Sequence, residues 1–274
     1  MPSESNAEDP HFPETSGRHR SHDRPPRYAD IRPRNPVLAR ASTGDRAGTR
    51  PGIRRRIAAV ASTLIAVAAI LFLASGQVAW TWAWVYLGIG LATTLVNGPI
   101  LLRRHPETIA ERGRLEPEKG WDRAVSGVYA LSQFLAVPLV AGLDARFHWS
   151  GEMGVGRHVS GAVLLAAAYA LPSWAMWSNA FFSTVARIQD DRGHAVCTTG
   201  PYRLVRHPGY AGFILQALGT PWLLGSHWAL VPGVVAAASM VVRTSFEDRM
   251  LQAQLPGYAE YARRVRYRLV PGIW

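Results

Sequence analysis

Six apolar runs without a single Asp, Glu, Lys or Arg are the feature that most limits how this chain can fold. A helix needs about 20 apolar residues to cross the hydrocarbon core of a bilayer. The first four runs are long enough, whereas the last two have only 16 residues each. The runs cover residues 57–75, 78–102, 124–143, 159–182, 210–225 and 227–242. The sequence therefore predicts an all-α integral membrane protein with about six transmembrane helices.

The last two runs are separated by Ser226, with Gly225 and His227 on either side. We interpret them as a short helical hairpin. The alternative is one interrupted or re-entrant segment. Both arrangements return the C-terminus to the side of the membrane where residue 210 begins, so the predicted orientation is the same for both.

The basic residues predict that orientation. The chain has 30 Lys and Arg residues and a formal net charge of +11. If the N-terminus is cytoplasmic and all six runs span, only Arg146 and Arg157 fall in outer loops, as the positive-inside rule requires. Both termini are then cytoplasmic, and the charge indicates contact with anionic lipid rather than nucleic acid. Lys119 is the only lysine, which points to a GC-rich genome and hence to a bacterial cytoplasmic membrane.

Three regions follow from these patterns. Residues 1–52 are rich in Pro, Arg, Ser and Asp with few apolar positions, a composition that predicts a disordered tail rather than a secretory leader. Residues 53–182 hold transmembrane helices 1–4. Residues 183–274 form the predicted catalytic region, with a cytoplasmic cofactor site, the hairpin and a C-terminal helix.

One polar stretch carries unusual chemistry for a connecting loop. Two X-Pro steps restrict its backbone, and three glycines permit close approach to another group. It reads Gly200-Pro201-Tyr202-Arg203-Leu204-Val205-Arg206-His207-Pro208-Gly209-Tyr210-Ala211-Gly212. Taken alone, His207 also fits an ordinary helix-entry residue in the headgroup layer.

A second candidate group follows the last apolar run. Arg243 and Glu247 are four residues apart, so they share one face if the helix continues beyond the membrane. They also fit a surface pair at a helix end. The hairpin favours a functional role, because it brings this end of the last run beside the segment that contains His207.

The C-terminal segment predicts a short interfacial helix. Tyr258, Tyr261 and Val265 recur at helical spacing with arginines beside them. Such a helix would lie on the membrane surface and cover the site.

Several chemistries lack their sequence signatures. Cys197 is the only cysteine, so a disulfide or a cysteine-based zinc site is not expected, and no metal is predicted. A phosphate-binding glycine loop, a dinucleotide fingerprint and a nucleophile elbow are also missing. His194 and His207 leave ligation of haem as an alternative.

The segment from His194 to Gly212 closely resembles the isoprenylcysteine carboxyl methyltransferase family. So do Arg243-x-x-x-Glu247 after a helical hairpin and Gly257-Tyr258-x-x-Tyr261 near the end. Phospholipid N-methyltransferases share parts of this pattern. The resemblance covers roughly residues 179–274, and it implies an integral membrane enzyme that uses S-adenosylmethionine.

The resemblance also implies roles for individual residues. Arg243 matches a position that engages the methyl acceptor, and Glu247 matches a cofactor position at the catalytic centre. The carboxylate of that cofactor needs hydrogen-bond donors, which His207, Arg206 or N–H groups of the loop could supply. The remaining cofactor-binding positions are Gln189, His194, Ala195, Val196, Cys197, Tyr202, His207, Pro208, Gly209 and Tyr210.

The implied reaction is direct methyl transfer to a lipophilic or lipidated acceptor. The resemblance favours a carboxylate acceptor, which is already a nucleophile and needs no general base. Amine and thiol acceptors stay open, although each would need deprotonation. Asp248 stands where many relatives have a second glutamate, so the acid pair is kept. The alternatives are a phospholipid N-methyltransferase and a non-catalytic membrane protein that binds a ligand or haem or assists assembly.

Overall fold

The computed structural model describes residues 36–113 and 119–274, with side chains from Arg50 onward within that range. It divides into two units, Met1–Gly44 and Asp45–Trp274. The side-chain contacts and the pocket described below all lie in the second unit. Helix α1 begins at Pro36, inside the segment 1–52 that the sequence predicts to be disordered. The first 35 residues of that segment lie outside the described part of the chain.

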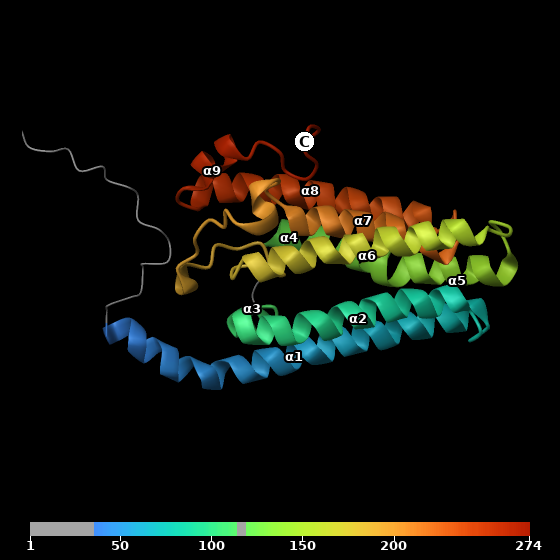
Figure 1. Ribbon diagram of the computed structural model, residues 1–274, viewed down its shortest axis with the longest axis horizontal. Helices are drawn as coiled ribbons and strands as arrows, with labels where there is room; N and C mark the ends of the chain where they lie inside the picture. Colours follow the sequence, from blue (N-terminus) through green and yellow to red (C-terminus); the bar gives the residue numbers. More distant parts are fainter. Residues whose placement is uncertain (1–35, 114–118) are drawn as a thin grey trace, which may run out of the picture. The chain divides into compact units, whose positions relative to one another are not determined.

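Helices make up the architecture of the second unit (Figure 1). A π-helical turn, Ser132–Ala136, connects α4 to α5, and two short 3₁₀ turns, Asp190–Arg192 and Gly200–Arg203, lie between α6 and α7. The α-helices are α1 (Pro36–Ser75), α2 (Thr81–Arg104), α3 (Pro106–Glu111), α4 (Gly120–Leu131), α5 (Val137–Phe147), α6 (Val155–Ser178), α7 (Pro208–Leu224), α8 (Leu230–Gln254) and α9 (Tyr258–Arg264).

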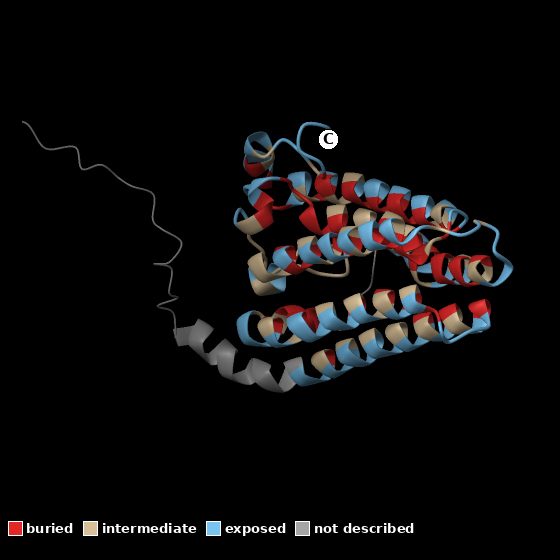
Figure 2. Ribbon diagram, turned by 45° about the vertical axis from the view of Figure 1, so that its right-hand side comes forward, coloured by how far each residue is buried: buried red, intermediate tan, exposed pale blue. Residues whose placement is uncertain are grey.

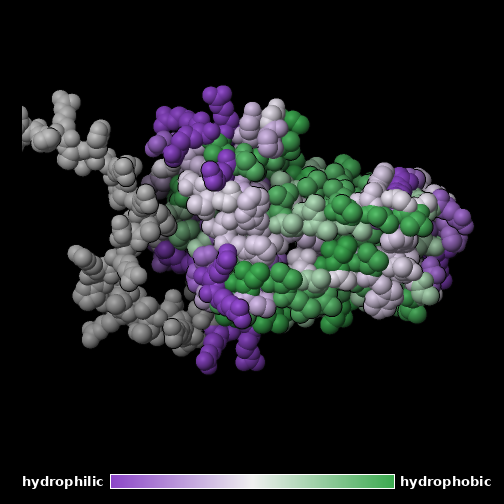
Figure 3. All heavy atoms as spheres, viewed as in Figure 1, coloured by the Kyte–Doolittle hydropathy of each residue, from purple (hydrophilic) through white to green (hydrophobic). Residues whose placement is uncertain are grey.

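Five helical segments of the described chain are long and apolar enough to cross a membrane. They are Arg50–Ser75, Thr81–Arg104, Gly120–Phe147, Val155–Ser178 and Leu230–Gln254. Their outward side chains are apolar, and Leu73 is 78% exposed. Figure 3 shows this apolar surface between hydrophilic ends. The structure therefore confirms the all-α integral membrane fold.

Helix α7, which the sequence counts among about six spans, is shorter than the five membrane-length segments. This helix has 17 residues, about 25 Å at the usual rise, and it is not among the five membrane-length segments. Pro208 begins it, and Gly225 ends it in the left-handed conformation at φ +76°, so the backbone limits its length at both ends.

The predicted hairpin is present. Helices α7 and α8 are joined by a short turn after Leu224 and pack side by side, and α7 also packs along α6. Glycines make these contacts close. A Cβ at Gly161 would lie 2.5 Å from the backbone nitrogen of Leu223, and one at Gly233 would lie 2.5 Å from the carbonyl oxygen of Ala217. Figure 2 shows the buried residues concentrated where these helices meet. Small residues at helix contacts are the usual means of tight packing in lipid.

Gly161→Ala is expected to destabilise the bundle, because overpacking costs about 1–3 kcal/mol. Gly156→Ala on the same helix is the matched control, since nothing lies within 4 Å of a Cβ there. Thermal unfolding in detergent measures both variants. Equal midpoints for the two variants would contradict the proposed close contact of α6 with α7.

Candidate active site

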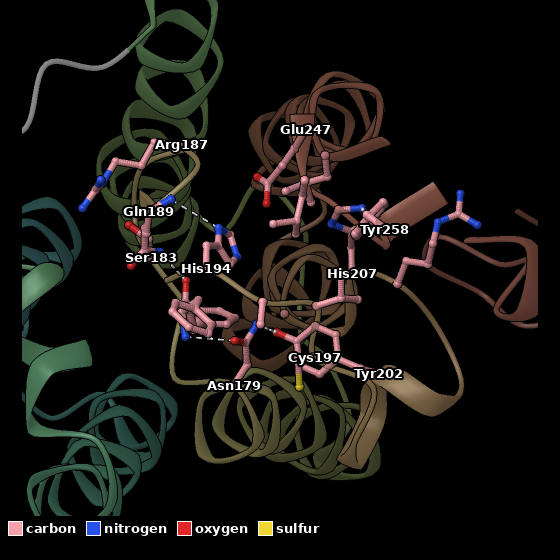
Figure 4. Close-up of a pocket in the computed structure, with 18 of the residues that line it drawn as sticks. Asn179, Ser183, Arg187, Gln189, His194, Cys197, Tyr202, His207, Glu247 and Tyr258 are labelled. Carbon is pink, nitrogen blue, oxygen red and sulfur yellow. Dashed lines mark hydrogen bonds between the residues drawn. The ribbon is translucent and has the colours of Figure 1, made fainter. Parts of the chain in front are cut away.

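A pocket opens at the hydrophilic end of the second unit that contains α9 (Figure 4). The loop after α6, the Gly200–Arg203 turn and the beginning of α7 form three of its walls, and the C-terminal parts of α8 and α9 complete it. The cavity encloses about 760 Å³ when its open mouth is included.

Ten of the residues that the sequence assigned to the site line this pocket, and two do not. Pro208 is the first residue of α7 and is buried outside the lining. Arg243 lies behind Tyr210, with its guanidinium carbon 5.3 Å from the centre of that ring. The lining residues are Gln189, His194, Ala195, Val196, Cys197, Tyr202, His207, Gly209, Tyr210 and Glu247.

The sides of the pocket come from different segments. Figure 4 shows Gln189 and His194 on one side, with His207 and Tyr258 across from them. Glu247 and Tyr202 occupy the remaining two sides. Residues far apart in the sequence therefore face one cavity.

Near the pocket, two glycines allow the backbone to approach neighbouring side chains closely. Gly200 has a φ of +57°, and a Cβ there would overlap the side chain of Ser178. A Cβ at Gly209 would lie 2.7 Å from the ring of Phe182. These contacts explain two of the glycines in the polar stretch.

The C-terminal segment holds the polar stretch in place. The backbone nitrogens of Arg206 and His207 donate to the carbonyl oxygens of Tyr267 and Arg268, both at 2.9 Å. The hydroxyl of Tyr261 donates to the carbonyl oxygen of Tyr202 at 2.7 Å. The loop is therefore tied to a part of the chain about 60 residues away.

Asp248 is the centre of a buried polar network, and its side chain is fully buried. The guanidinium of Arg206 binds it through Nε and Nη2, at 2.7 and 2.9 Å. Arg268 donates to it at 2.9 Å and the hydroxyl of Tyr258 at 3.0 Å. The ring of His207 lies 3.3 Å from the same carboxylate. Burial and this carboxylate raise the pKa of Tyr258 far above its ordinary value, so its hydroxyl stays protonated and donates.

Arg206 also lines the pocket. Its Nη1 donates to the carbonyl oxygens of Val265 and Arg266, both at 2.8 Å. Most of its donors therefore bind Asp248 and the C-terminal segment, and its expected role toward a cofactor carboxylate stays a prediction. The two adjacent acids of α8 face in different directions. Glu247 lines the pocket, whereas Asp248 points into the protein.

Glu247 accepts a short hydrogen bond from the hydroxyl of Tyr210. The ring of Tyr210 stacks against His207, with 5.7 Å between ring centres. One carboxylate oxygen of Glu247 is therefore held by α7, and the group is positioned at the pocket wall. The predicted closeness of Glu247 to the segment around His207 is confirmed.

Arg243 has Asp122 as its ion-pair partner. Its Nε lies 2.9 Å from Oδ1 of Asp122, and its Nη2 donates to the carbonyl oxygen of Thr184 at 2.7 Å. Asp122 is fully buried and also accepts from the backbone nitrogen of Ala186 at 2.8 Å. The pair links α4, α8 and the pocket loop. The sequence analysis missed Asp122, because its only signal was an acid at the start of an apolar run.

Gln189 and His194 form the opposite wall. The side-chain amide of Gln189 donates to the carbonyl oxygen of Phe181 at 2.7 Å and accepts a short hydrogen bond from Arg192. The ring of His194 lies 4.7 Å from the ring of Phe181. Burial and the charge of Arg192 lower the pKa of His194, so this ring is neutral at pH 7.

The covering role predicted for the C-terminal helix agrees with the geometry. Tyr258 and Tyr261 on α9 are buried and line the pocket. The tyrosine face of α9 is thus turned toward the site. Contact of this helix with lipid stays a prediction.

Membrane-length helices that close a polar pocket at one end define an integral membrane protein with a small-molecule site. Residues 161–253 match the model of the isoprenylcysteine carboxyl methyltransferase (ICMT) family. The matched segment contains the motif between His194 and Gly212 on which the resemblance rests.

Individual relatives agree with the family match. A probable protein-S-isoprenylcysteine O-methyltransferase from Oryza sativa subsp. indica is 38% identical over 87 residues, 31% of this chain and 45% of the relative. Protein-S-isoprenylcysteine O-methyltransferase A from Arabidopsis thaliana is 28% identical over 146 residues, 52% of this chain and 70% of the relative. The cobalt-zinc-cadmium resistance protein CzcN from Cupriavidus metallidurans is 39% identical over 80 residues, 28% of this chain and 36% of the relative. The chain thus spans less than half of the rice relative's length.

Asp248→Ala is expected to destabilise the protein by about 3–5 kcal/mol, because it leaves buried cationic donors without their partner. Thermal unfolding in detergent measures the loss. Glu260→Ala changes an exposed side chain on α9, so it serves as the control and should keep the wild-type midpoint. A wild-type midpoint for Asp248→Ala would show that the network is not needed for the fold.

Proposed function

We propose that this protein is a membrane-embedded methyltransferase that uses S-adenosylmethionine and acts on the carboxylate of a lipophilic acceptor. One observation carries the proposal: ten positions that the family motif assigns to the cofactor come from four separate segments and line one pocket. The O-methyltransferase names of the rice and Arabidopsis relatives support the reaction class.

The residues present fit this cofactor. Glu247 supplies a carboxylate at the pocket wall, suited to an ammonium or sulfonium group. The rings of Tyr202, Tyr258 and Phe181 line the same space and favour a cation over their faces. The neutral ring of His194 adds a polar wall without adding a positive charge.

The bound cofactor would supply an activated methyl group on sulfur, and the protein would supply alignment. Tyr210 would hold the Glu247 carboxylate in place through its hydrogen bond. Arg243 would orient the anionic acceptor, and Asp122 would fix the direction of that guanidinium. The covering tyrosines of α9 would exclude water, so that binding and orientation account for most of the rate enhancement.

The surface beside Arg243 supports a lipophilic acceptor. A shallow apolar groove runs between α4 and α8, lined by Ala124, Val125, Val128, Val235, Ala238, Ser239 and Val242. These two helices also carry Asp122 and Arg243. A hydrocarbon chain in the groove would thus bring an acidic head toward the buried pair of Asp122 and Arg243.

Positive charge at the pocket end of the protein indicates that this end faces the cytoplasm.

Glu247→Gln is expected to weaken S-adenosylmethionine binding at least tenfold, because the amide removes the negative charge that faces the cation. Isothermal titration calorimetry of the detergent-purified protein measures this change. Glu260→Gln makes the same substitution on an exposed surface and should bind as the wild type does. Unchanged affinity in Glu247→Gln would remove that residue from the cofactor site, and no binding to a folded wild-type protein would favour a non-catalytic role.

Arg243→Ala is expected to abolish turnover and to change cofactor affinity less than twofold, because the guanidinium lies behind Tyr210 rather than in the lining. Transfer of labelled methyl to a lipid extract measures turnover, and calorimetry measures cofactor binding. Loss of cofactor binding in this variant would show that Arg243 acts on the cofactor instead. Labelled phospholipid amines would identify an N-methyltransferase.

A further inference from the structure

Arg112 has a positive charge that the described residues leave without an acidic partner. It follows α3 directly and is half-buried, and its guanidinium carbon lies over the ring of Phe182, 5.2 Å from the ring centre. Phe182 lines the pocket. This arginine therefore stands at the edge of the candidate site, although neither the motif nor the proposed reaction assigns it a role.

Two contacts fix α3 against the pocket loop. The hydroxyl of Thr108 donates to the carbonyl oxygen of Ala180 at 2.6 Å. Nη2 of Arg187 lies 2.7 Å from the carboxylate of Glu111. The backbone on which Arg112 stands is thus attached on both sides to the segment that carries Phe182, so the position of its guanidinium is a property of the fold.

A second arginine is brought to the same place by α1. A Cβ at Gly52 would lie 2.6 Å from the carbonyl oxygen of Ala110, and one at Gly113 would lie 3.2 Å from the backbone nitrogen of Arg56. The cytoplasm-facing end of α1 therefore packs directly on the end of α3. Arg56 is partly buried there.

The acids around this cluster are engaged elsewhere. Glu111 binds Arg187, Asp122 binds Arg243, and Glu247 accepts from Tyr210. Burial, followed by the charges of Arg56 and Arg243, lowers the pKa of Arg112 well below its ordinary value. Arginine nevertheless keeps its proton in proteins. Since charges removed from water are normally paired, the cluster lacks an anion among the described residues.

We infer that Arg112, with Arg56 beside it, forms an anion site that binds the carboxylate of the membrane acceptor. Arg112 stacks on Phe182 and Arg243 stacks on Tyr210, and both rings line the pocket. Each of the two guanidinium groups thus lies against an aromatic ring of the pocket lining. Arg243 is already neutralised by Asp122, whereas Arg112 supplies the net positive charge that selects an acid over its neutral ester. This inference rests on the proposed function.

The test measures ligand binding rather than turnover. The full-length protein is placed in nanodiscs of phosphatidylcholine with a photoreactive diazirine derivative of palmitate, or with the methyl ester of that probe. Labelled protein is quantified by mass spectrometry across a range of probe mole fractions. The wild type should favour the acid over the ester by about tenfold or more, the scale of a charge-assisted hydrogen bond.

Arg112→Gln should reduce this preference to twofold or less, and Arg112→Lys should keep part of it because the charge remains. Arg103→Gln removes an exposed arginine at the end of α2 and should match the wild type. Unfolding midpoints confirm that each variant is folded. A full preference in folded Arg112→Gln would overturn the proposal.

Two further arms identify the source of the anion and separate this proposal from the enzymatic one. Displacement of the acid probe by phosphatidylglycerol or by inorganic phosphate would show a phosphate site and overturn the assignment to the acceptor. Acid preference without S-adenosylmethionine binding would support the anion site and reject the proposed function. Cofactor binding without acid preference would reject the anion site alone.

Discussion

The buried carboxylate of Asp248 is the interaction on which the pocket depends. Arg206 binds it from the polar stretch, Tyr258 from α9 and Arg268 from the C-terminal segment. A buried charge is tolerated only when its partners are in place. Asp248 therefore joins the polar stretch and α9, which both line the pocket, to the C-terminal segment.

The two consecutive acids on α8 lie in different environments. Successive residues of an α-helix point about 100° apart, so Glu247 faces the pocket while Asp248 faces the interior. Arg243 lies one turn before Glu247, but its ion-pair partner is Asp122 on α4. The spacing of four residues thus placed Arg243 and Glu247 on the same side of the helix without pairing them, and Tyr210 contacts both.

Sequence reasoning succeeded where a signal is local or where connectivity is short. The apolar runs predicted the helices, and the brief turn at Gly225 predicted that α7 and α8 are neighbours. It counted α7 among about six spans, whereas this 17-residue helix is shorter than the five membrane-length segments of the described chain. It assigned no role to Asp122, since an acid beside an apolar run is ordinarily a solvated helix end.

The sequence by itself determined the membrane-helical class and the polar stretch, which depend on residue type and on distances along the chain. Its resemblance to the methyltransferase family marked the residues that meet in the pocket. Only the tertiary structure decided which charges are paired: Asp248 with Arg206 and Arg268, Asp122 with Arg243, and Arg112 with no acid among the described residues. The physical reason is that an ion pair acts over a few ångströms, and helix packing alone brings such distant residues that close.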